Sequence, residues 1–448
     1  MPRSRLKSAL ACVSIALGLA GIAAPAQAAP GDETLAPYVP GEVVVGYEHG
    51  GTRVTELPAA TPVADAVSEL EREPGVRFAV PNYVATAAAI RPLDLGTAQV
   101  PGGWALDQWS FLSQPGGIRV RRAWGRLAAA GRPGGAGVTV AIVDTGIAYA
   151  PTIQGGAAPD FAANQFVRGI DLVDDDERPL DENGHGTHVA ATIGEQITLE
   201  RPASSDDYLT GLAYGAKLMP VRVLDSHGEG AATDVGAGIL WAAKNGADVI
   251  NVSLQFDPSI TSCKQVPTVC AATKRATRRG AIVIAAGGNA LAGPGQPGPL
   301  YPGAAPGVFA VGATTENGCL AEYSHFGKGI DMVAPGGGGP RADKIRRECV
   351  SDARPILALT LECFPGTCGL GLYGDFGIRA DTGTSMASAH ASGVAALVIA
   401  AGTAGKKPSP RQIARRLRCT GRPLTPRSLY RAGQLDALRA VQPKFRCR

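Results

Sequence analysis

From about residue 104 onward, short apolar runs alternate with segments whose apolar residues recur at helical spacing. The runs predict buried strands at 137–144, 216–224, 247–254, 281–287 and 307–314. The segments between them predict helices at 185–194, 233–246 and 269–280. Continuous apolar strands separated by helices are typical of a parallel sheet covered on both faces, so we predict a doubly wound, mostly parallel α/β fold. The sites of such folds lie beyond the carboxyl ends of the strands.

The pattern before residue 104 is different and predicts a separate small unit over residues 29–95. The predicted elements of this unit are a strand at 41–47, a helix at 63–76 and a strand at 77–84. Residues 85–103 carry little hydrophobic signal and predict a linker that is accessible to proteolysis. We therefore expect a second folded part over residues 96–448, which ends in a basic helical segment at 406–448.

The first 28 residues have the make-up of a secretory signal. Three basic residues precede an apolar stretch, which ends in the small-residue sequence Ala26-Gln27-Ala28. The apolar part is interrupted by Ser14 and glycines, and it is short for a membrane span. The residues before Cys12 match a lipid-attachment site poorly. We therefore expect cleavage after Ala28, secretion of the remaining chain, and no membrane anchor.

One of the nine cysteines lies in the signal, which leaves an even number in the exported chain. An even number suits disulfides in an oxidising compartment, and the absence of any CxxC pair argues against a zinc site. Two local disulfides are predicted, Cys263–Cys270 and Cys419–Cys447. Three pairings remain open for the other four cysteines, which are Cys319, Cys349, Cys363 and Cys368.

The formal charge of +4 is distributed unevenly along the chain. Residues 406–448 hold 13 Lys and Arg against a single acidic residue, Asp436, so the rest of the exported chain is strongly acidic. A solvated basic helix pair on an acidic body is the simplest interpretation, and binding to an anionic surface or a nucleic acid is the alternative. Nothing else in the sequence indicates nucleic-acid chemistry, and we expect a monomer.

Three reactive side chains occur where the predicted fold would bring them to one rim of the sheet. Asp144 ends a predicted strand, and His185 and Ser385 each open a predicted helix. A serine hydroxyl becomes a useful nucleophile when a neutral imidazole accepts its proton, and the imidazole needs a carboxylate to fix its tautomer. The order Ser, Asp, His and the GxSxG elbow of α/β-hydrolases are both absent, which disfavours a lipase or esterase.

Seven short sequences between residues 137 and 400 follow one another in the order found in the subtilisin-like serine peptidases, or subtilases. They are VAIVDTGI, NGHGTHVAATIG, INVSL, AAGGNA, YPGAAPGVFAVGAT, DMVAPG and GTSMASAHASG. The chain therefore resembles this family, and GQLDALRAV (433–441) resembles the family's usual C-terminal ending. Three catalytic blocks in the right order are a specific signal, whereas any one of them alone would be weak.

The resemblance implies a role for each of these residues. It makes Asp144 the orienting acid, His185 the general base and Ser385 the nucleophile of a serine endopeptidase. Asn289 matches the family's oxyanion-hole asparagine, whose amide would act together with the Ser385 backbone N–H at a helix N-terminus. The resemblance also implies that an extended substrate lies along INVSL. The substrate-binding residues would be Ser253, Leu254, Gln255, Ala286, Gly287 and Leu300.

The chain departs from the family at the substrate groove and at one calcium loop. Gln255-Phe256 replaces glycines that usually follow INVSL, and Leu300 replaces a small residue that usually leaves the specificity pocket deep. We therefore expect a preference for small or medium side chains before the cleaved bond. The loop at 195–211 does not resemble the family's main calcium loop. The sequence leaves room for structural calcium near Asp174–Asp176 but assigns no ion there, and no cofactor is expected.

The N-terminal unit resembles the inhibitory propeptide of the same family. PGEVVVGY and EPGVRFAVPNYV resemble the two ends of that propeptide, which is a small ferredoxin-like βαββαβ unit. The resemblance implies that residues 29–95 assist folding, block the cleft, and are removed by self-cleavage between Tyr83 and Trp104. We therefore expect a zymogen whose partners are protein or peptide substrates and its own propeptide.

Each of these residues also has a purely structural interpretation. Ser385 could be an ordinary N-cap, and Asp144 could be a turn former at a strand end. His185 and His188 stand three residues apart and could bind zinc, but no HExxH glutamate accompanies them. His188 and His390 are expected to serve packing and hydrogen bonding. The alternative function is a catalytically silent subtilase fold that binds peptides. It is disfavoured because the acid, the base, the nucleophile and the oxyanion-hole asparagine are all present.

Overall fold

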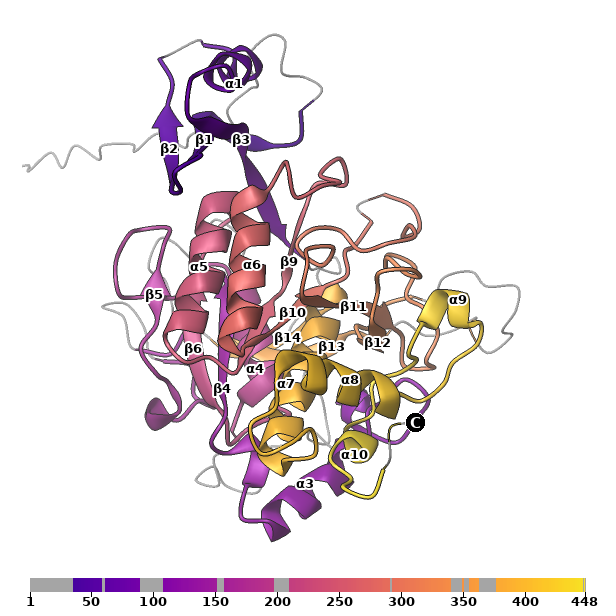
Figure 1. Cartoon of the computed structure of the whole chain (residues 1–448). Helices are drawn as coiled ribbons and strands as arrows, with labels where there is room; N and C mark the ends of the chain where they lie inside the picture. Colours follow the sequence, from indigo (N-terminus) through magenta and orange to yellow (C-terminus); the bar gives the residue numbers. More distant parts are fainter. Residues whose placement is uncertain are drawn as a thin grey trace, which may run out of the picture.

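The computed structural model describes residues 35–58, 61–88, 108–150, 157–196, 209–290, 292–339, 349, 354–361, 376–445 and 447. A small N-terminal unit stands on a larger body that is built around a central sheet (Figure 1). The predictions for the signal sequence, for Cys12 and for the pairing of Cys363 and Cys368 lie outside the described residues.

The core of the body is a seven-stranded sheet in which every pair of neighbouring strands is parallel. Across the sheet the strands are β12 (Met332–Pro335), β11 (Val308–Thr314), β10 (Ile282–Ala286), β8 (Val249–Val252), β4 (Thr139–Asp144), β6 (Lys217–Arg222) and β5 (Ile170–Asp171). In β4, Val140 and Ile142 belong to one hydrophobic cluster, and Ala141 and Val143 belong to the other. Alternate residues of the strand therefore bury both faces, which confirms the predicted α/β class.

Helices cover both faces of this sheet (Figure 1). One cluster joins the sheet to α5 (Ala232–Lys244) and α6 (Pro267–Arg279). The other joins it to α3 (Val120–Ala129), α4 (His185–Gly194) and α7 (Thr384–Ala401). By length and hydropathy α7 alone among the described helices passes for a membrane span, but 89% of it is buried inside the protein, as in a core helix. The strands and helices predicted for the body are confirmed to within a few residues.

Several shorter elements of the body were not predicted. β7 (Glu229–Ala231) and β9 (Leu254–Phe256) lie outside the central sheet, and β13 (Ile356–Leu361) and β14 (Phe376–Asp381) form an antiparallel pair. Three short 3₁₀ turns occur at Trp109–Phe111, Pro133–Gly135 and Ala163–Gln165. The helical segment that was predicted at 406–448 contains α8 (Pro410–Thr420), α9 (Arg427–Tyr430) and α10 (Ala437–Ala440).

The N-terminal unit is simpler than the βαββαβ pattern that the resemblance implied. Its described residues form β1 (Tyr38–Tyr47), β2 (Thr52–Glu56), α1 (Val63–Leu70) and β3 (Val76–Ala87), with the antiparallel order β2-β1-β3. The helix ends six residues earlier than predicted, because Pro74 restricts the residue before it and Gly75 adopts a φ of 82°. A small core that includes Val43, Val45 and Ala79 joins the sheet to α1.

The end of β3 leaves the N-terminal unit and enters the body. Residues 84–86 pair with β7 on one side, and residues 85–87 pair with β9 on the other, both antiparallel. The linker predicted to begin at residue 85 is therefore wrong for residues 85–88. These residues have little hydrophobic pattern of their own, and their hydrogen-bond partners come from segments more than 130 positions later in the chain.

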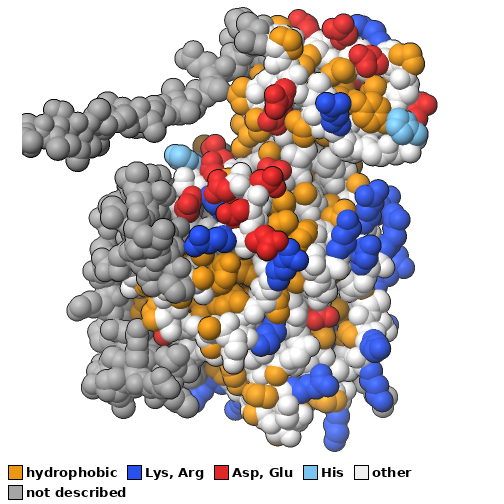
Figure 2. All heavy atoms as spheres, turned by 90° about the vertical axis from the view of Figure 1, so that its left-hand side faces the viewer, with side chains coloured by type: hydrophobic (Ala, Val, Ile, Leu, Met, Phe, Trp, Pro, Cys, Tyr) orange, Lys and Arg blue, Asp and Glu red, His pale blue; other side chains and the backbone are white. Residues whose placement is uncertain are grey.

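The basic C-terminal segment uses several of its arginines to hold itself together. The Arg416 guanidinium donates to the carbonyls of Ala440 at 2.9 Å and of Phe445 at 2.7 Å. Buried Asp436 forms ion pairs with Arg119 and Arg422, and Arg418 pairs with Asp331. Acidic side chains gather on one face of the body below the N-terminal unit, as the simplest interpretation of the charge pattern expects (Figure 2).

Three disulfides join described cysteines. Cys263–Cys270 and Cys419–Cys447 are formed as predicted from the sequence. Cys319 pairs with Cys349, which selects among the three pairings that the sequence left open. Four cysteines between residues 319 and 368 allow three pairings, so only the tertiary structure could choose this one.

Two buried histidines make the fold sensitive to acid. His188 and His390 are buried, and burial lowers the pKa of each ring from 6.5 to about 4. The unfolded chain binds these protons below about pH 6.5 and the folded chain does not, so the free energy of unfolding falls as the pH drops from about 6.5 to about 4. Each histidine accounts for a loss of up to about 3 kcal/mol over that range.

The substitution His390→Asn is expected to reduce this acid sensitivity. Asparagine has a donor that can replace the Nδ1 contact with the Met386 carbonyl at 2.7 Å, and it does not titrate. Urea unfolding of a Ser385→Ala protein at pH 7 and pH 4.5, with and without His390→Asn, measures the difference. An identical loss of stability in both proteins would show that His390 stays neutral on unfolding or is already charged in the fold.

Candidate active site

Asp144 and His185 meet at the carboxyl edge of the central sheet. Asp144 is the last residue of β4, and His185 is the first residue of α4, which follows Gly184 at a φ of 95°. The His185 Nδ1 lies 2.6 Å from Asp144 Oδ1, and both side chains are buried. A proton on Nδ1 donates to the carboxylate, which leaves Nε2 as the basic nitrogen. Nε2 has no hydrogen-bond partner among the described residues.

Asp181, which sequence reasoning missed, fixes the start of α4. Its buried carboxylate accepts hydrogen bonds from the backbone N–H groups of Asn183, Gly184 and Thr187 at 2.8–2.9 Å. It also accepts from the hydroxyls of Thr145 and Thr187. Because the turn that carries His185 is bonded to one carboxylate, the imidazole has a defined position. The only sequence signal was an aspartate four residues before the histidine.

Ser385 lies at the start of α7 and is fully buried. Its hydroxyl donates to the Ser253 carbonyl at 2.9 Å, so it does not donate to His185 in this structure. The structure thus brings Asp144 and His185 into direct contact, whereas the serine–imidazole hydrogen bond is not formed.

The Ala88 carbonyl, at the end of β3, points between two donors of the body. The Ser385 backbone N–H donates to it at 3.1 Å, and the Asn289 side-chain amide donates at 2.7 Å. The Ala88 N–H in turn donates to the Ser253 carbonyl at 3.1 Å. Ala88 is 1% exposed, so this carbonyl and its donors are shielded from water. This is the geometry that an oxyanion hole requires, with two donors within hydrogen-bond reach of one carbonyl oxygen.

Asn289 is held by the residue that precedes Ser385. The backbone N–H and the hydroxyl of Thr384 donate to Asn289 Oδ1 at 3.0 and 2.8 Å. Because Oδ1 is fixed in this way, the amide nitrogen must point to the opposite side, toward Ala88. These bonds also establish which side-chain atom is the nitrogen, since Oδ1 accepts from a backbone N–H.

The residues expected to bind substrate fall into two groups. Leu254 and Gln255 pair with Ala87 and Thr86 of β3, and the Ser253 carbonyl binds Ala88, so this group contacts the strand in the groove. The second group is Ala286, Gly287 and Leu300, near the end of β10. The Leu300 N–H donates to the Gly287 carbonyl at 2.9 Å, and Leu300 is 7% exposed. A Cβ added at Gly288 would lie 2.7 Å from Leu300 Cγ, so Leu300 occupies the space beside Asn289.

The described residues near the site do not form a metal centre. His188 turns its Nε2 toward the carbonyls of Ile356 and Arg379, at 3.2 and 3.3 Å, rather than toward a site shared with His185. Among the described residues no group of three or more His, Cys, Asp or Glu could hold a metal ion. Asp174, near which the sequence leaves room for calcium without assigning it, forms an ion pair with Arg222.

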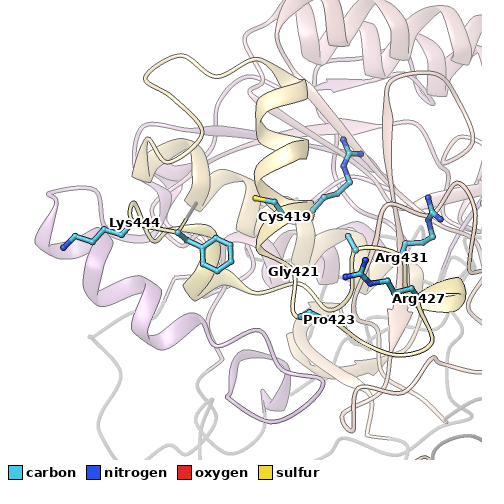
Figure 3. Close-up of a pocket in the computed structure, with 9 residues that line it drawn as sticks. Cys419, Gly421, Pro423, Arg427, Arg431 and Lys444 are labelled. Atoms are coloured by element: carbon cyan, nitrogen blue, oxygen red, sulfur yellow. The ribbon is translucent and has the colours of Figure 1, made fainter. Parts of the chain in front are cut away.

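A hollow in the C-terminal segment is lined by basic residues but lies away from these groups. Its lining comes from Cys419, Gly421 and Pro423 together with Arg427, Arg431 and Lys444 (Figure 3). Lys444 extends on one side and Arg427 and Arg431 lie on the other, so the cations do not converge on one point (Figure 3). The hollow therefore provides no counterpart to the catalytic arrangement.

The fold and the site define a serine hydrolase of α/β architecture, with an aspartate–histidine pair and a serine at a helix start on one edge of a parallel sheet. The model of the subtilase family matches residues 135–433 of the chain. The chain therefore belongs to the subtilase family of serine peptidases.

The relatives compared below come from bacteria, and their names identify them as proteases. Subtilisin Savinase of Lederbergia lenta is 34% identical over 314 residues, which are 69% of this chain and 92% of that protein. M-protease of Shouchella clausii (strain KSM-K16) is also 34% identical over 69% of this chain, and the match spans 65% of its own length. The extracellular protease of Xanthomonas campestris pv. campestris is 32% identical over 330 residues, which are 65% of this chain and 48% of that protein.

A solved structure shares the architecture. A protease from the bacterium Pseudoalteromonas arctica superposes with a TM-score of 0.58 at 28% identity. The superposition covers 76% of this chain and 98% of that one. The match extends beyond single motifs to most of the fold, in agreement with the parallel sheet and its covering helices.

Proposed function

We propose that the chain is a secreted serine endopeptidase that is made as a zymogen and cuts itself between Ala88 and Ala89. Asp144, His185 and Ser385 form its triad, and Asn289 and the Ser385 N–H form its oxyanion hole. The observation that carries this proposal is the Ala88 carbonyl, which accepts from both donors of that hole. Export is supported by the three disulfides and by the name of the extracellular relative from Xanthomonas campestris.

The end of β3 occupies the groove as a bound substrate would. The end of β3 lies as the middle strand between β7 and β9, so its backbone groups pair on both sides. An extended peptide that adds a strand to its receptor binds through main-chain hydrogen bonds and places alternate side chains in pockets. Until it is cut and released, the same strand excludes other substrates. The N-terminal unit thus acts both as the first substrate and as the inhibitor.

The proposed chemistry begins with a movement of the Ser385 side chain away from the Ser253 carbonyl. The Ser385 hydroxyl turns from the Ser253 carbonyl to His185 Nε2, gives up its proton there, and attacks the Ala88 carbonyl carbon. The negative charge that develops on the oxygen is stabilised by Asn289 and the Ser385 N–H, at the positive end of the α7 dipole. His185 then donates the proton to the departing Ala89 nitrogen, and water releases the acyl group in a second round. Apart from that water, the chain's own residues supply every group in this sequence.

The wild-type protein is expected to acquire a new N-terminus at Ala89. Among the described residues, the Ala88 carbonyl is the one that both donors reach. The expected cut after Ala88 is therefore narrower than the interval from Tyr83 to Trp104 that the resemblance implied. N-terminal sequencing and intact mass of the secreted protein measure the position. A mature, active protein that begins at Ala29, or a cut upstream of Ala88, would contradict the proposal.

The substrate class that fits the groove is protein with a small side chain before the cleaved bond. Ala88 occupies that position, and Leu300 fills the space beside Asn289. Replacing Leu300 by glycine is expected to raise kcat/KM for peptides with Phe at this position by at least about tenfold relative to Ala, because the pocket gains the volume of a side chain. Profiling of matched Ala and Phe peptides measures the ratio. A wild-type preference for Phe or Tyr would refute the role of Leu300.

A further inference from the structure

Gln255 forms an unusual contact with the oxyanion hole. It is the central residue of β9, where its backbone pairs with Thr86 in the groove, and it is 3% exposed. Its side chain does not enter the groove. Gln255 Oε1 accepts from the Asn289 N–H at 2.7 Å, and Gln255 Nε2 donates to the Asn289 carbonyl at 3.1 Å. One side-chain amide therefore binds both backbone groups of one residue, as a neighbouring strand would.

Asn289 is held from two directions, and only one of its polar groups is left for the substrate. Gln255 binds its backbone N–H and carbonyl, and Thr384 binds its side-chain Oδ1. The remaining group is Nδ2, which donates to the Ala88 carbonyl at 2.7 Å. The residue before it, Gly288, adopts a φ of 110°, a left-handed conformation that glycine adopts without steric cost.

We propose that Gln255 is a positioning residue, which holds the backbone of Asn289 so that its side-chain amide is aimed at the reacting carbonyl. The proposal rests on the proposed function and adds a residue to its machinery. A donor stabilises a transition state only when it is fixed before the charge develops, and a misplacement of about 1 Å can remove a large part of the effect. Because the backbone of Gln255 also binds the substrate strand, the same residue links the groove to the hole.

The substitution Gln255→Met tests the proposal, because methionine keeps the length of the side chain and removes both hydrogen bonds. The expected result is a kcat lower by about tenfold with KM changed less than about twofold, since the transition state is affected and the strand pairing is not. Gln255→Glu keeps the acceptor for the Asn289 N–H but turns a carboxylate oxygen toward the Asn289 carbonyl and brings a negative charge near the developing oxyanion, so it should be at least as slow as Gln255→Met. It also provides a second variant if methionine prevents folding.

A double-mutant cycle with Asn289→Ala separates positioning from general damage. If Gln255 acts through the Asn289 amide, Gln255→Met should lower kcat by less than about twofold once that amide is gone. The matched control is Gln434→Met, which removes a buried glutamine amide that binds Thr314 and Gly116 elsewhere in the body. This control should lose stability by a similar amount and keep kcat.

The outcomes distinguish this inference from the proposed function. A wild-type protein without serine-dependent peptidase activity would overturn the function itself. With that activity present, the positioning role is overturned if Gln255→Met leaves kcat unchanged or raises only KM. It is also overturned if the full tenfold loss persists in the Asn289→Ala background. The tenfold loss in kcat that vanishes in that background supports it.

Discussion

Ser385→Ala is expected to stop self-cleavage and to lower peptidase turnover by about a millionfold, which is the loss that subtilisin shows for its own serine. The hydroxyl is the only group removed, and the backbone N–H of the same residue donates to the Ala88 carbonyl at 3.1 Å. The secreted protein should accumulate with the N-terminal unit still attached. Intact mass and turnover of a small-residue peptide measure both effects.

The matched control for this prediction is Ser392→Ala on the same helix. Ser392 is buried and donates to Asn251 Oδ1 at 2.9 Å, so its loss removes one buried hydrogen bond of the helix while the donors to the Ala88 carbonyl and the Asn251 bond to the Ser253 hydroxyl stay in place. This variant should mature normally. If Ser385→Ala matured and cleaved peptides at the wild-type rate, another group would be the nucleophile. If the wild type neither matured nor reacted with a serine-directed fluorophosphonate, the chain would be a peptide-binding subtilase without catalysis.

Asn289→Ala is expected to lower kcat by about a hundredfold to a thousandfold with little change in KM, the range found for removal of one oxyanion-hole donor in subtilisin. The amide contributes most when the carbonyl oxygen gains charge, so the transition state loses more than the bound substrate does. Steady-state kinetics of the matured enzyme on one peptide separates the two parameters. A loss confined to KM would place Asn289 in ground-state binding only.

Asn289→Asp serves as the companion of that variant. A carboxylate keeps the acceptor that Thr384 uses and therefore keeps the local structure, but it replaces the donor by a negative charge next to the developing oxyanion. This variant should be at least as slow as Asn289→Ala at neutral pH. Activity near the wild-type level in Asn289→Asp would show that the side chain serves structure through Thr384 rather than catalysis.

Much of the fold and of the site was predictable because it depends on local pattern. The apolar strand that ends at Asp144 and the glycine-flanked helix starts at His185 and Ser385 are visible within short windows of sequence. The residues that hold the site residues in position were not predictable. Asp181 and Thr384 are common polar residues in loops and helix starts. Their role comes from hydrogen bonds to residues in and next to the site, five for Asp181 and three for Thr384.

The sequence by itself determined the α/β class and the order of the strands and helices along the chain, and it predicted the residues that would serve as acid, base and nucleophile. Apolar periodicity and motif order are properties of the chain that need no partner. Only the tertiary structure decided that Ala88 presents its carbonyl to Asn289, that Gln255 turns toward Asn289, and that Cys319 pairs with Cys349. Each of these contacts joins segments distant in the chain, and its free energy is gained only when the complete fold brings the two segments within bonding distance.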